Sequence, residues 1–527
     1  MPQNKSSFLY GLFFFSLIFL GMTALFVVTG PWGLGVSEDS VHYLSGARGL
    51  LNGQGYRSDF RNESITYFPP LFSFLTACIG FIFKMDALHA ARILQVLLFG
   101  VNAALAGYFL KQVTGSAKIS LIGVWLMLTS NAMFNVHSMA WSEPLFFSFV
   151  FPGFYCLHRY FENEQKRYLI FSGILIALAS LVRYAGVSVI STGLVMILLF
   201  HPRGFTARVK DGFIFFAVSY LPSALWFVRN LLTAGELANR DLGFHVPTSR
   251  YFNQAMNTIS TWILPEEIPE IVRHFVFRTV LLALLGLFLF LVFKKGKDKA
   301  AAEVLASHPP FRFVASMIIF VIFNAVLLIV HLFLMNVNTQ ANDRHFSPFY
   351  VACLMSALIV LSEWLKVSRR PKILKGLFAF LLIAMTSFNL FAFQRNWIEM
   401  YRSGKAFTSR QWKTSPTLAK IETLPGKLLI YSNDPSIIYI NTGRPAARLP
   451  RKYNKQHTRK GEEAKPAKTY FPRIANVKRR LESREGYVVF FLDRHRWFNP
   501  PQKELQELLP IQIVETLQDG VIYRTKE

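Results

Sequence analysis

Apolar runs long enough to cross a lipid bilayer recur through this 527-residue sequence as far as about residue 393. The first run extends from Phe8 to Val28 without a charged residue. A membrane-spanning helix needs about 20 such residues. The 52 phenylalanines are more than the core of a soluble domain would use. The sequence therefore predicts an α-helical, polytopic membrane protein, and its first run is interpreted as an uncleaved anchor because it is long for a signal peptide.

Lysine and arginine orient these runs, because both residues are enriched in short cytoplasmic loops. Lys5 places the N-terminus in the cytoplasm, and Lys111 places the loop at 111–118 on the same side. Successive crossings alternate in direction, so with both of these ends in the cytoplasm only two crossings fit between them. The short apolar segment 70–84 must therefore lie at the outer face without crossing. About eleven crossings are then expected, with the C-terminus outside: 8–28, 88–110, 118–137, 143–159, two within 168–200 that meet at Arg183-Tyr184, 211–231, 275–293, 312–334, 346–366 and 375–393.

Residues 394–527 lose the long apolar runs and are predicted to form a small extracytoplasmic α/β domain. Residues 428–431 and 487–492 are typical of buried strands, and 511–524 of a hairpin. The basic segment 444–480 is interpreted as a solvated loop. The predicted domains are a membrane domain, 1–393, with external loops at 29–87 and 232–274, and the extracytoplasmic domain, 394–527.

The formal net charge of +26 does not indicate nucleic-acid binding, because no recognition module accompanies it. Much of the excess lies in short loops between the apolar runs, and close to half lies in the last quarter of the chain. We expect membrane lipids as partners, with the basic tail lying against anionic headgroups or lipid phosphates.

The polar stretch 37–70 directly follows the first span and opens with the acidic pair Glu38 and Asp39. A helical pattern follows from Ser40 to Leu51, and Gly53 ends it. An acidic pair on a short helix at the membrane edge is more typical of an active site than of a connection.

Under the predicted topology, further ionisable residues reach the same outer interface. They are Glu143, Arg183, and the consecutive residues Asp343, Arg344 and His345. Ionisable residues at membrane depth are energetically costly, so each is a functional candidate. A carboxylate can accept a proton from an acceptor hydroxyl or orient an acceptor amine. Nearby cations can neutralise a phosphate that leaves a sugar carbon. These groups together suit glycosyl transfer from a polyprenyl-phosphate sugar.

Each candidate also has a structural interpretation. The acidic pair could cap the following helix, Glu143 before Pro144 suits a helix start, and Arg183 and Arg344 could extend toward the interface as topology anchors. His42, His137 and His345 are isolated, which favours structural roles. A divalent metal held by Asp39 and Glu143 is not favoured, because hard cations usually take more oxygen ligands, and no cofactor is expected. The sequence contains no glycine-rich phosphate loop, so a nucleotide-sugar donor is not expected.

Several ordered motifs give the chain a family resemblance. The acidic pair, the LLNGQGY end of the next helix and the PPL segment resemble the first external loop of C-type (GT-C) glycosyltransferases. HSMAWSEPLFF, LASLVRYAGVSV and NDRHFSPFY resemble the later acidic, basic and basic-then-proline motifs of the same superfamily. The tail YSNDPSIIYINTGRPAARLP resembles the external domain of the lipid A aminoarabinose transferases, and the protein O-mannosyltransferases are also similar.

The resemblance implies a GT-C fold with external juxtamembrane helices, and it implies site roles. Asp39 would be the catalytic acidic residue of an inverting transfer, and Glu143 would support the acceptor or that aspartate. Arg183 and Arg344 would hold the donor phosphate, with Glu38, Tyr67 and His345 as supporting residues. The chain lacks the lysine that aminoarabinose transferases carry beside the proline, and the histidine that O-mannosyltransferases place before the double proline.

We therefore expect a glycosyltransferase of the plasma (inner) membrane that moves a sugar from a polyprenyl-phosphate-linked donor. Its acceptor would be a lipid, glycan or protein at the outer face of the cell envelope. Two alternatives remain open. A transporter or flippase of lipid-linked sugars would show paired halves with interrupted helices, which this sequence lacks. A glycan polymerase or ligase would use a large late loop, and 232–274 carries Arg240, Asp241, His245 and Arg250.

Overall fold

The computed structural model describes residues 2–58, 60, 63–238, 243–244, 246–247, 249–296, 301–334, 341–368, 371–426, 428–453, 466–494 and 496–526. The chain forms two compact units. The helical unit comprises residues 1–30 and 66–400, and the α/β unit comprises residues 31–65 and 401–527. Residues 31–65 therefore group with the C-terminal residues, although the 335 residues from 66 to 400 separate the two segments in the chain.

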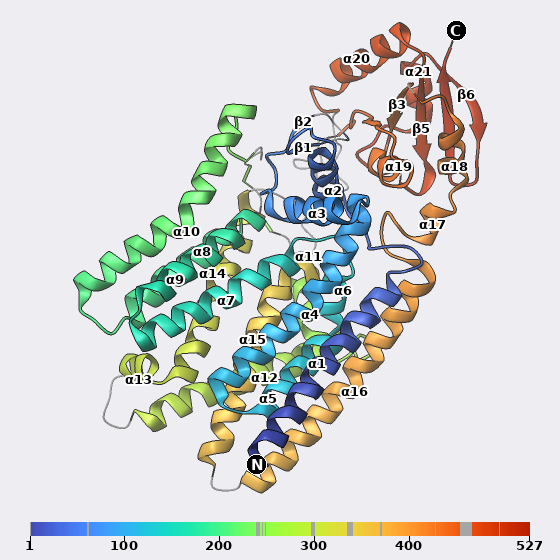
Figure 1. Cartoon of the computed structure of the whole chain (residues 1–527). Coiled ribbons are helices and arrows are strands. Elements are labelled where there is room, and N and C mark those ends of the chain that lie inside the picture. Colours follow the sequence, from blue (N-terminus) through green and yellow to red (C-terminus); the bar gives the residue numbers. More distant parts are fainter. Residues whose placement is uncertain are drawn as a thin grey trace. The chain divides into compact units, whose positions relative to one another are not determined.

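The helical unit consists of long apolar helices joined by short connections (Figure 1). Its elements are α1 (Pro2–Val28), α3 (Leu71–Phe83), α4 (Ala87–Thr114), α5 (Ala117–Thr129), α6 (Asn131–His137), α7 (Glu143–Asn163), α8 (Lys166–Val182), α9 (Gly186–Phe200), α10 (Phe205–Ala234), α11 (Ser249–Ser260), α12 (Glu270–Lys295), α13 (Ala301–Ser307), α14 (Pro309–Leu334), α15 (Asp343–Val367) and α16 (Pro371–Ser403).

The predicted class, an α-helical polytopic membrane protein, is confirmed. Seven of the helices in the described residues are long and apolar enough to span a membrane: α1, α4, α10, α12, α14, α15 and α16. An eighth is counted if α5 and α6 form one span, but these helices meet at an angle of 59°. The predicted crossing 118–137 is therefore bent, because Ser130 ends α5 and its side chain caps α6. The total of eleven crossings stays a prediction.

The predicted break within the apolar run 168–200 is confirmed. Helix α8 ends at Val182, Arg183 has extended backbone angles (φ −148°, ψ 139°), and α9 begins at Gly186. A Cβ atom at Gly186 would lie 2.5 Å from the Cα of Ser180, so only glycine lets the chain pass the end of α8 so closely. The break therefore places a charged side chain between two apolar helices.

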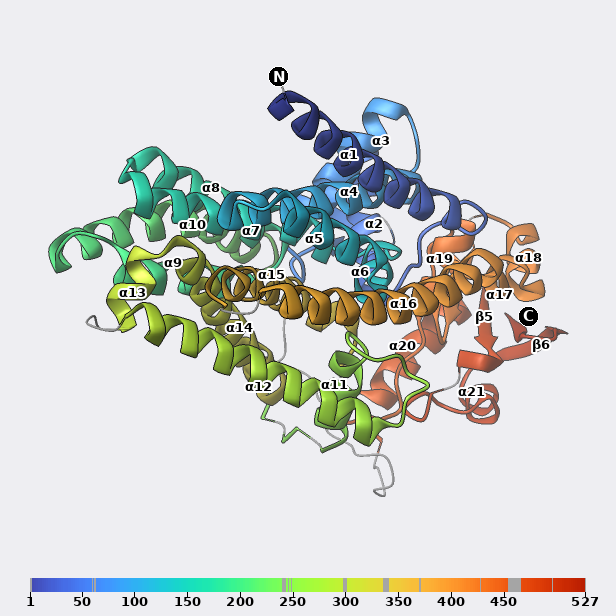
Figure 2. The same cartoon turned by 90° about the horizontal axis from the view of Figure 1, so that it is seen from below.

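The helices around this break pack tightly. Helix α8 contacts α7 and α10, and α4 contacts α1, α5 and α7. Gly153 in α7 allows this approach, because a Cβ atom there would lie 2.9 Å from Ile176 of α8, and the Ser172 hydroxyl donates to the Gly153 carbonyl at 2.8 Å. Helices α1 and α12 lie at opposite edges of the helical unit and expose most of their apolar side chains (Figure 2), as expected of helices that face lipid.

The small α/β region predicted at the C-terminus is present. Its sheet has the order β4-β3-β5-β7-β6, formed by β3 (Leu429–Ser432), β4 (Ala447–Arg448), β5 (Gly486–Phe491), β6 (Ile511–Thr516) and β7 (Gly520–Thr525). Strand β3 is parallel to β4 and β5, and β7 is antiparallel to β5 and β6. The pairing of 511–524 as a hairpin is as predicted. Its connecting helices are α17 (Arg410–Lys413), α18 (Pro416–Thr423), α19 (Pro435–Thr442), α20 (Tyr470–Ser483) and α21 (Gln502–Leu508).

Part of the predicted solvated loop 444–480 is helical instead. Helix α20 buries Tyr470, Ile474, Val477 and Leu481, which repeat at helical spacing and pack against Val488 and other core residues. The positive residues of α20 occupy its other face, so a strongly basic segment still has an apolar face. Residues 454–465 of that predicted loop lie outside the described residues.

Residues 31–65, which fall within the predicted loop 29–87, contact the rest of the α/β unit through backbone and side-chain groups. They contain α2 (Glu38–Leu51) and the short antiparallel strands β1 (Arg57–Ser58) and β2 (Glu63–Ser64). Phe407 donates its backbone N–H to Val36 at 3.0 Å, and the Thr408 hydroxyl donates to the Leu34 carbonyl at 2.5 Å. The ring of Tyr439 in α19 lies 4.9 Å from that of Phe60.

Candidate active site

Glu143 is the first residue of α7, and its side chain is 1% exposed. The sequence Ser-Glu-Pro explains this local structure, because proline suits the first turn of a helix and an acidic side chain is stabilised by the positive end of the helix dipole. The approach to α7 is fixed on both sides. The Gln95 amide donates to the Trp141 carbonyl at 2.5 Å, and the Asn102 amide donates to the Pro144 carbonyl at 2.9 Å.

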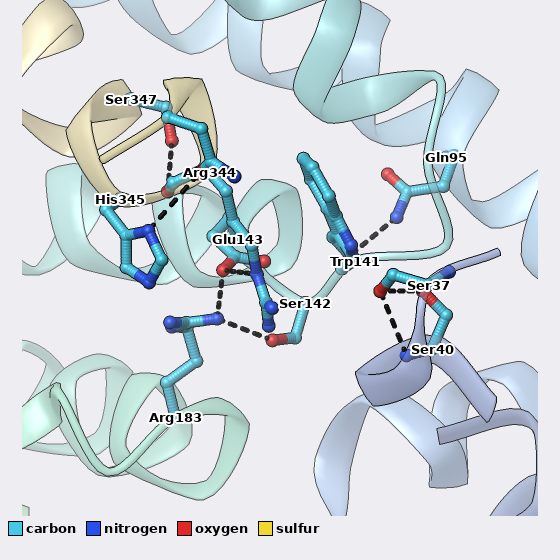
Figure 3. Close-up of polar contacts among 11 residues, drawn as sticks. Ser37, Ser40, Gln95, Trp141, Ser142, Glu143, Arg183, Arg344, His345 and Ser347 are labelled. Carbon is cyan, nitrogen blue, oxygen red and sulfur yellow. Dashed lines mark hydrogen bonds and ion pairs between the residues drawn. The ribbon is translucent and has the colours of Figure 1, made fainter. Parts of the chain in front are cut away.

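Two arginines converge on one oxygen of this buried carboxylate (Figure 3). Arg183 Nη1 donates to Glu143 Oε1 and, at 3.1 Å, to the Ser142 hydroxyl. Arg344 Nε donates to the same Oε1 at 2.6 Å, and the Arg344 guanidinium lies 5.3 Å from the centre of the Trp141 ring. The structure thus brings together three of the residues predicted from the sequence.

The second oxygen of the carboxylate, Glu143 Oε2, is buried and accepts no hydrogen bond from any residue in the described part of the chain. A buried acceptor without a donor is energetically unfavourable, so such groups in native proteins often mark a place where a ligand or water donates. Two guanidinium groups and one carboxylate give this cluster a formal charge of +1. The cluster can therefore attract an anion and still present a carboxylate oxygen to a donor.

A second hydrogen-bond network, centred on Asn102, supports the first turn of α7, where Glu143 lies. Asn102 of α4 contacts His137 Nε2 at 3.1 Å and accepts at 2.9 Å from the Ser148 hydroxyl of α7. The other ring nitrogen of His137 lies 2.8 Å from the Met133 carbonyl. His137 is fully buried, and its contacts are those of the structural role expected for it.

Tyr184 anchors the break that carries Arg183. Its hydroxyl donates to the Thr66 carbonyl at 2.7 Å and accepts from the Trp226 indole at 3.2 Å. Its ring stacks on that of Phe227, with the centres 5.4 Å apart. Arg183 is therefore followed directly by a residue that ties three separate parts of the helical unit together.

Asp39 is the second residue of α2, in the α/β unit. The helix is capped by Ser37 and Ser40, each of which accepts a hydrogen bond from the backbone N–H of the other (Figure 3). The N-cap residue of α2 is therefore Ser37, and the acidic pair lies in the first turn of the helix. Glu38 Oε1 lies 3.4 Å from Arg448 Nη2 of the same unit. The structure does not group Asp39 with Glu143, since the two residues belong to different units.

The other predicted residues occupy varied positions. His345 Nδ1 lies 3.2 Å from the Asn342 side-chain oxygen at the start of α15, and Tyr67 is half-buried between β2 and α3. Arg250 lies in α11, whereas Arg240, Asp241 and His245 are outside the described residues. Within the described residues, no three His, Cys, Asp or Glu side chains form a group that could hold a metal ion.

Sequence reasoning missed the residues that support the cluster: Trp141, Ser142, Asn102 and Tyr184. Ser142 had a signal, because serine before Glu-Pro is typical of a helix start. Asn102 also had one, since a carboxamide in the middle of an apolar span needs a partner.

The sequence and the structure were compared with those of known proteins. A sequence model described as "Dolichyl-phosphate-mannose-protein mannosyltransferase" matches residues 68–226, which include Glu143 and Arg183. No curated protein matches the sequence. Among solved structures, ArnT from Cupriavidus metallidurans in the apo state has a TM-score of 0.53 at 12% identity, covering 99% of this chain and 98% of that one.

Other similar structures share this architecture. ArnT from the same organism bound to undecaprenyl phosphate has a TM-score of 0.51 at 12% identity over 96% of this chain and 97% of that one. The arabinofuranosyltransferase AftD from Mycobacteria has a TM-score of 0.53 at 13% identity, covering 98% of this chain and 41% of that one. The chain thus shares the fold of the C-type (GT-C) class of membrane glycosyltransferase structures. Within that class, its fold is similar to that of ArnT over nearly its whole length.

Proposed function

We propose that this protein transfers a sugar from a polyprenyl-phosphate-linked donor to a lipid, glycan or protein acceptor at the outer face of the plasma (inner) membrane. The N-terminus would be cytoplasmic and the α/β unit extracytoplasmic. The observation that carries the proposal is the convergence of Arg183 and Arg344 on buried Glu143. The bound undecaprenyl phosphate in one ArnT structure supports the same class of donor.

The net positive charge of the cluster suits a phosphate. Arginine presents several N–H donors in a fixed plane, so a guanidinium that holds Glu143 with one edge keeps other N–H groups for a phosphate oxygen. The side chain of Arg183 is 22% exposed and that of Arg344 is 12% exposed, whereas that of Glu143 is 1% exposed. A ligand would therefore meet the cations before the carboxylate.

In the proposed reaction, the acceptor oxygen or nitrogen attacks the anomeric carbon of the donor sugar. The bond from that carbon to the phosphate oxygen breaks, and its electron pair leaves with polyprenyl phosphate. Arg183 and Arg344 stabilise the additional negative charge on the phosphate. We assign the carboxylate of Asp39 to receive the acceptor proton, on the basis of the family resemblance. A single displacement of this kind inverts the configuration at the anomeric carbon.

Glu143 would orient the acceptor in this scheme. Its Oε2 accepts no hydrogen bond within the described residues, so it is available to an acceptor hydroxyl or amine. Both arginines donate to the other oxygen, Oε1, so Oε2 is the oxygen left for the acceptor.

The test is release of free polyprenyl phosphate from a panel of polyprenyl-phosphate monosaccharides. The purified protein is incubated with native membrane extract as the source of acceptor, and wild type is compared with Asp39→Asn. Asp86→Asn is the matched control, because Asp86 is an exposed N-cap of α4, where asparagine caps equally well.

We expect release with one sugar, loss of release in Asp39→Asn, and normal release in Asp86→Asn. Normal release in Asp39→Asn would overturn the assignment of the acidic residue. Binding of the donors without release from any of them would overturn the transferase proposal and favour a transporter of lipid-linked sugars.

A further inference from the structure

A second polar site lies in the helical unit, in a pocket of about 450 Å³. This volume is within the range of roughly 300–1,000 Å³ that is typical of ligand pockets. Most such pockets are apolar, but this one is lined by charged and uncharged polar side chains. Five of them are carboxamides, from α6, α11, the residue before α15, and α16: Asn131, Asn135, Asn257, Asn342 and Asn396.

The carboxamides are held in defined orientations. Asn257 donates to Glu270 at 2.8 Å and lies 2.7 Å from His274 Nε2, and Asn396 donates to Asn131. A carboxamide carries two N–H donors and an oxygen that can accept twice. Fixed amides of this kind match the hydroxyl groups of a sugar, each of which both donates and accepts. A lipid chain could not satisfy them.

Arg273 of α12 adds a charge to this lining. The residue is 5% exposed, and its Nε is buried without a hydrogen-bond partner. In the part of the chain that the structure describes, no carboxylate lies within ion-pair distance of its guanidinium. The other arginine in the lining, Arg395, is paired with Glu267 and lies 3.6 Å from Glu266. The lining also contains the carboxylates of Glu266, which lies by Arg395, and Asp343, which accepts from Asn135. A buried cation without a counter-ion is costly, so an anionic group of a ligand beside Arg273 would be stabilising.

The pocket adjoins the Glu143 cluster through α15. Asp343 lines the pocket and accepts from the Asn135 amide at 2.9 Å, and the next residue, Arg344, contacts Glu143. Trp262, which follows the lining residue Thr261, packs its ring edge-on against Tyr350 of α15 and Phe277 of α12. The first two residues of one helix thus face two different polar sites.

We infer that this pocket binds a sugar unit of the acceptor that carries an acidic group, with its carboxylate or phosphate on Arg273 and its hydroxyls on the carboxamides. The inference rests on the proposed function, because it names the acceptor class as an acidic glycan. The apolar chain of the donor would find no matching surface here. The acceptor sugar would sit beside the helix start that also positions Arg344.

The test is binding of monosaccharides to the purified protein in lipid nanodiscs, measured by saturation-transfer difference NMR. The probes are methyl glucuronide, glucose 6-phosphate and neutral methyl glucoside. We compare wild type with Arg273→Gln and with Arg278→Gln, a matched control on the same helix whose side chain is exposed and does not line the pocket. Thr261→Phe, which fills the pocket without removing a charge, is a second variant in case Arg273→Gln does not fold.

We expect at least one acidic sugar to bind about tenfold more tightly than methyl glucoside, a difference that Arg278→Gln keeps and Arg273→Gln abolishes. Thr261→Phe should lose all binding. Whether the uronate or the phosphate binds more tightly identifies the acidic group. Equal binding of acidic and neutral sugars, or an unchanged preference in Arg273→Gln or Thr261→Phe, would overturn the inference.

This measurement requires no donor lipid, so it is independent of the release experiment. Release that depends on Asp39 without any sugar binding would overturn the pocket and leave the transferase intact. Binding of acidic sugars without release would retain the pocket and overturn the transferase.

Discussion

The Nε of Arg344 lies 2.6 Å from Oε1 of Glu143, a residue 201 positions earlier in the chain. The hydrogen bond joins the starts of α15 and α7, two helices that also pack against each other. Because Arg183 reaches the same oxygen from the end of α8, three helix ends meet at one carboxylate. Both guanidinium groups are held in position by this carboxylate, which is itself a buried charged group.

Replacing Glu143 with glutamine should lower both turnover and stability. The variant keeps the volume of the side chain but leaves two guanidinium groups without their counter-charge in a buried place. We expect turnover to fall by about ten- to a hundredfold, corresponding to about 1.5–3 kcal/mol for a charged hydrogen bond. Polyprenyl phosphate release and the apparent melting temperature in detergent measure the two effects. Glu164→Gln, at the exposed other end of α7, should change neither.

Arg183→Lys should raise the donor concentration needed for half-maximal rate, although the charge is kept. Arg183 donates to Glu143 and Ser142 through Nη1 alone, so its Nη2 and Nε groups stay available to the phosphate. A lysine ammonium has one nitrogen and cannot hold these two residues and the phosphate in the same geometry. We expect an increase of about tenfold in KM for the donor, the equivalent of about 1.4 kcal/mol. Arg167→Lys, at an exposed position of α8, provides the control. An unchanged donor KM would contradict the phosphate-binding role of Arg183.

Tyr184→Phe should loosen the segment around Thr66 without removing any charge. The hydroxyl donates to the Thr66 carbonyl at 2.7 Å, and its loss should cost about 1 kcal/mol. Hydrogen exchange of residues 66–68, measured by mass spectrometry, should become faster. Tyr220→Phe, on helix α10 with its side chain 39% exposed, should leave exchange unchanged. Equal exchange in Tyr184→Phe and wild type would contradict this role of the Tyr184 hydroxyl.

Asp519→Ala should destabilise the α/β unit. The carboxylate accepts from the Thr417 backbone N–H at 3.2 Å, from the Thr417 hydroxyl at 2.6 Å and from the Ser415 hydroxyl, so it holds the start of α18. The loss should be about 1–3 kcal/mol, as expected when several donors lose their acceptor. Limited proteolysis of the full chain should cleave residues 410–425 faster. Glu507→Ala, on the exposed side of α21, should behave as wild type, and equal cleavage rates in both variants would contradict this role.

The sequence predicted those features that depend on local patterns. Apolar length located the seven helices that are long enough to span a membrane. The charged residue Arg183 located the break, because a charge in the middle of an apolar run marks a discontinuity. Strand β5 (Gly486–Phe491) was predicted as 487–492, because the six consecutive apolar residues there, followed by Asp493, suit a strand buried on both faces. The convergence of Glu143, Arg183 and Arg344 was predictable from the topology alone, because the alternating direction of the predicted crossings placed all three residues at the outer interface.

Features that depend on long-range pairing were not predictable. Nothing near Val36 indicates that its carbonyl will accept from Phe407, and nothing near Asn102 identifies Pro144 as its partner. Helix α20 was missed because its charge outweighs its apolar stripe in composition, although Tyr470, Ile474, Val477 and Leu481 keep helical spacing. The pocket around Arg273 was missed because its carboxamides come from four separate segments that no short motif connects.

The contacts between residues 31–65 and the C-terminal residues impose an order on biosynthesis. The Trp32 indole donates to the Tyr401 carbonyl and the Thr408 hydroxyl to the Leu34 carbonyl, across separations of 369 and 374 residues. At about 5–20 residues per second, the ribosome needs roughly 20–75 s to deliver the partners of residues 31–65. During that interval the segment that carries Asp39 has already left the ribosome but lacks its scaffold. A nascent chain stalled before residue 401 would therefore carry the acidic pair without the fold that holds it.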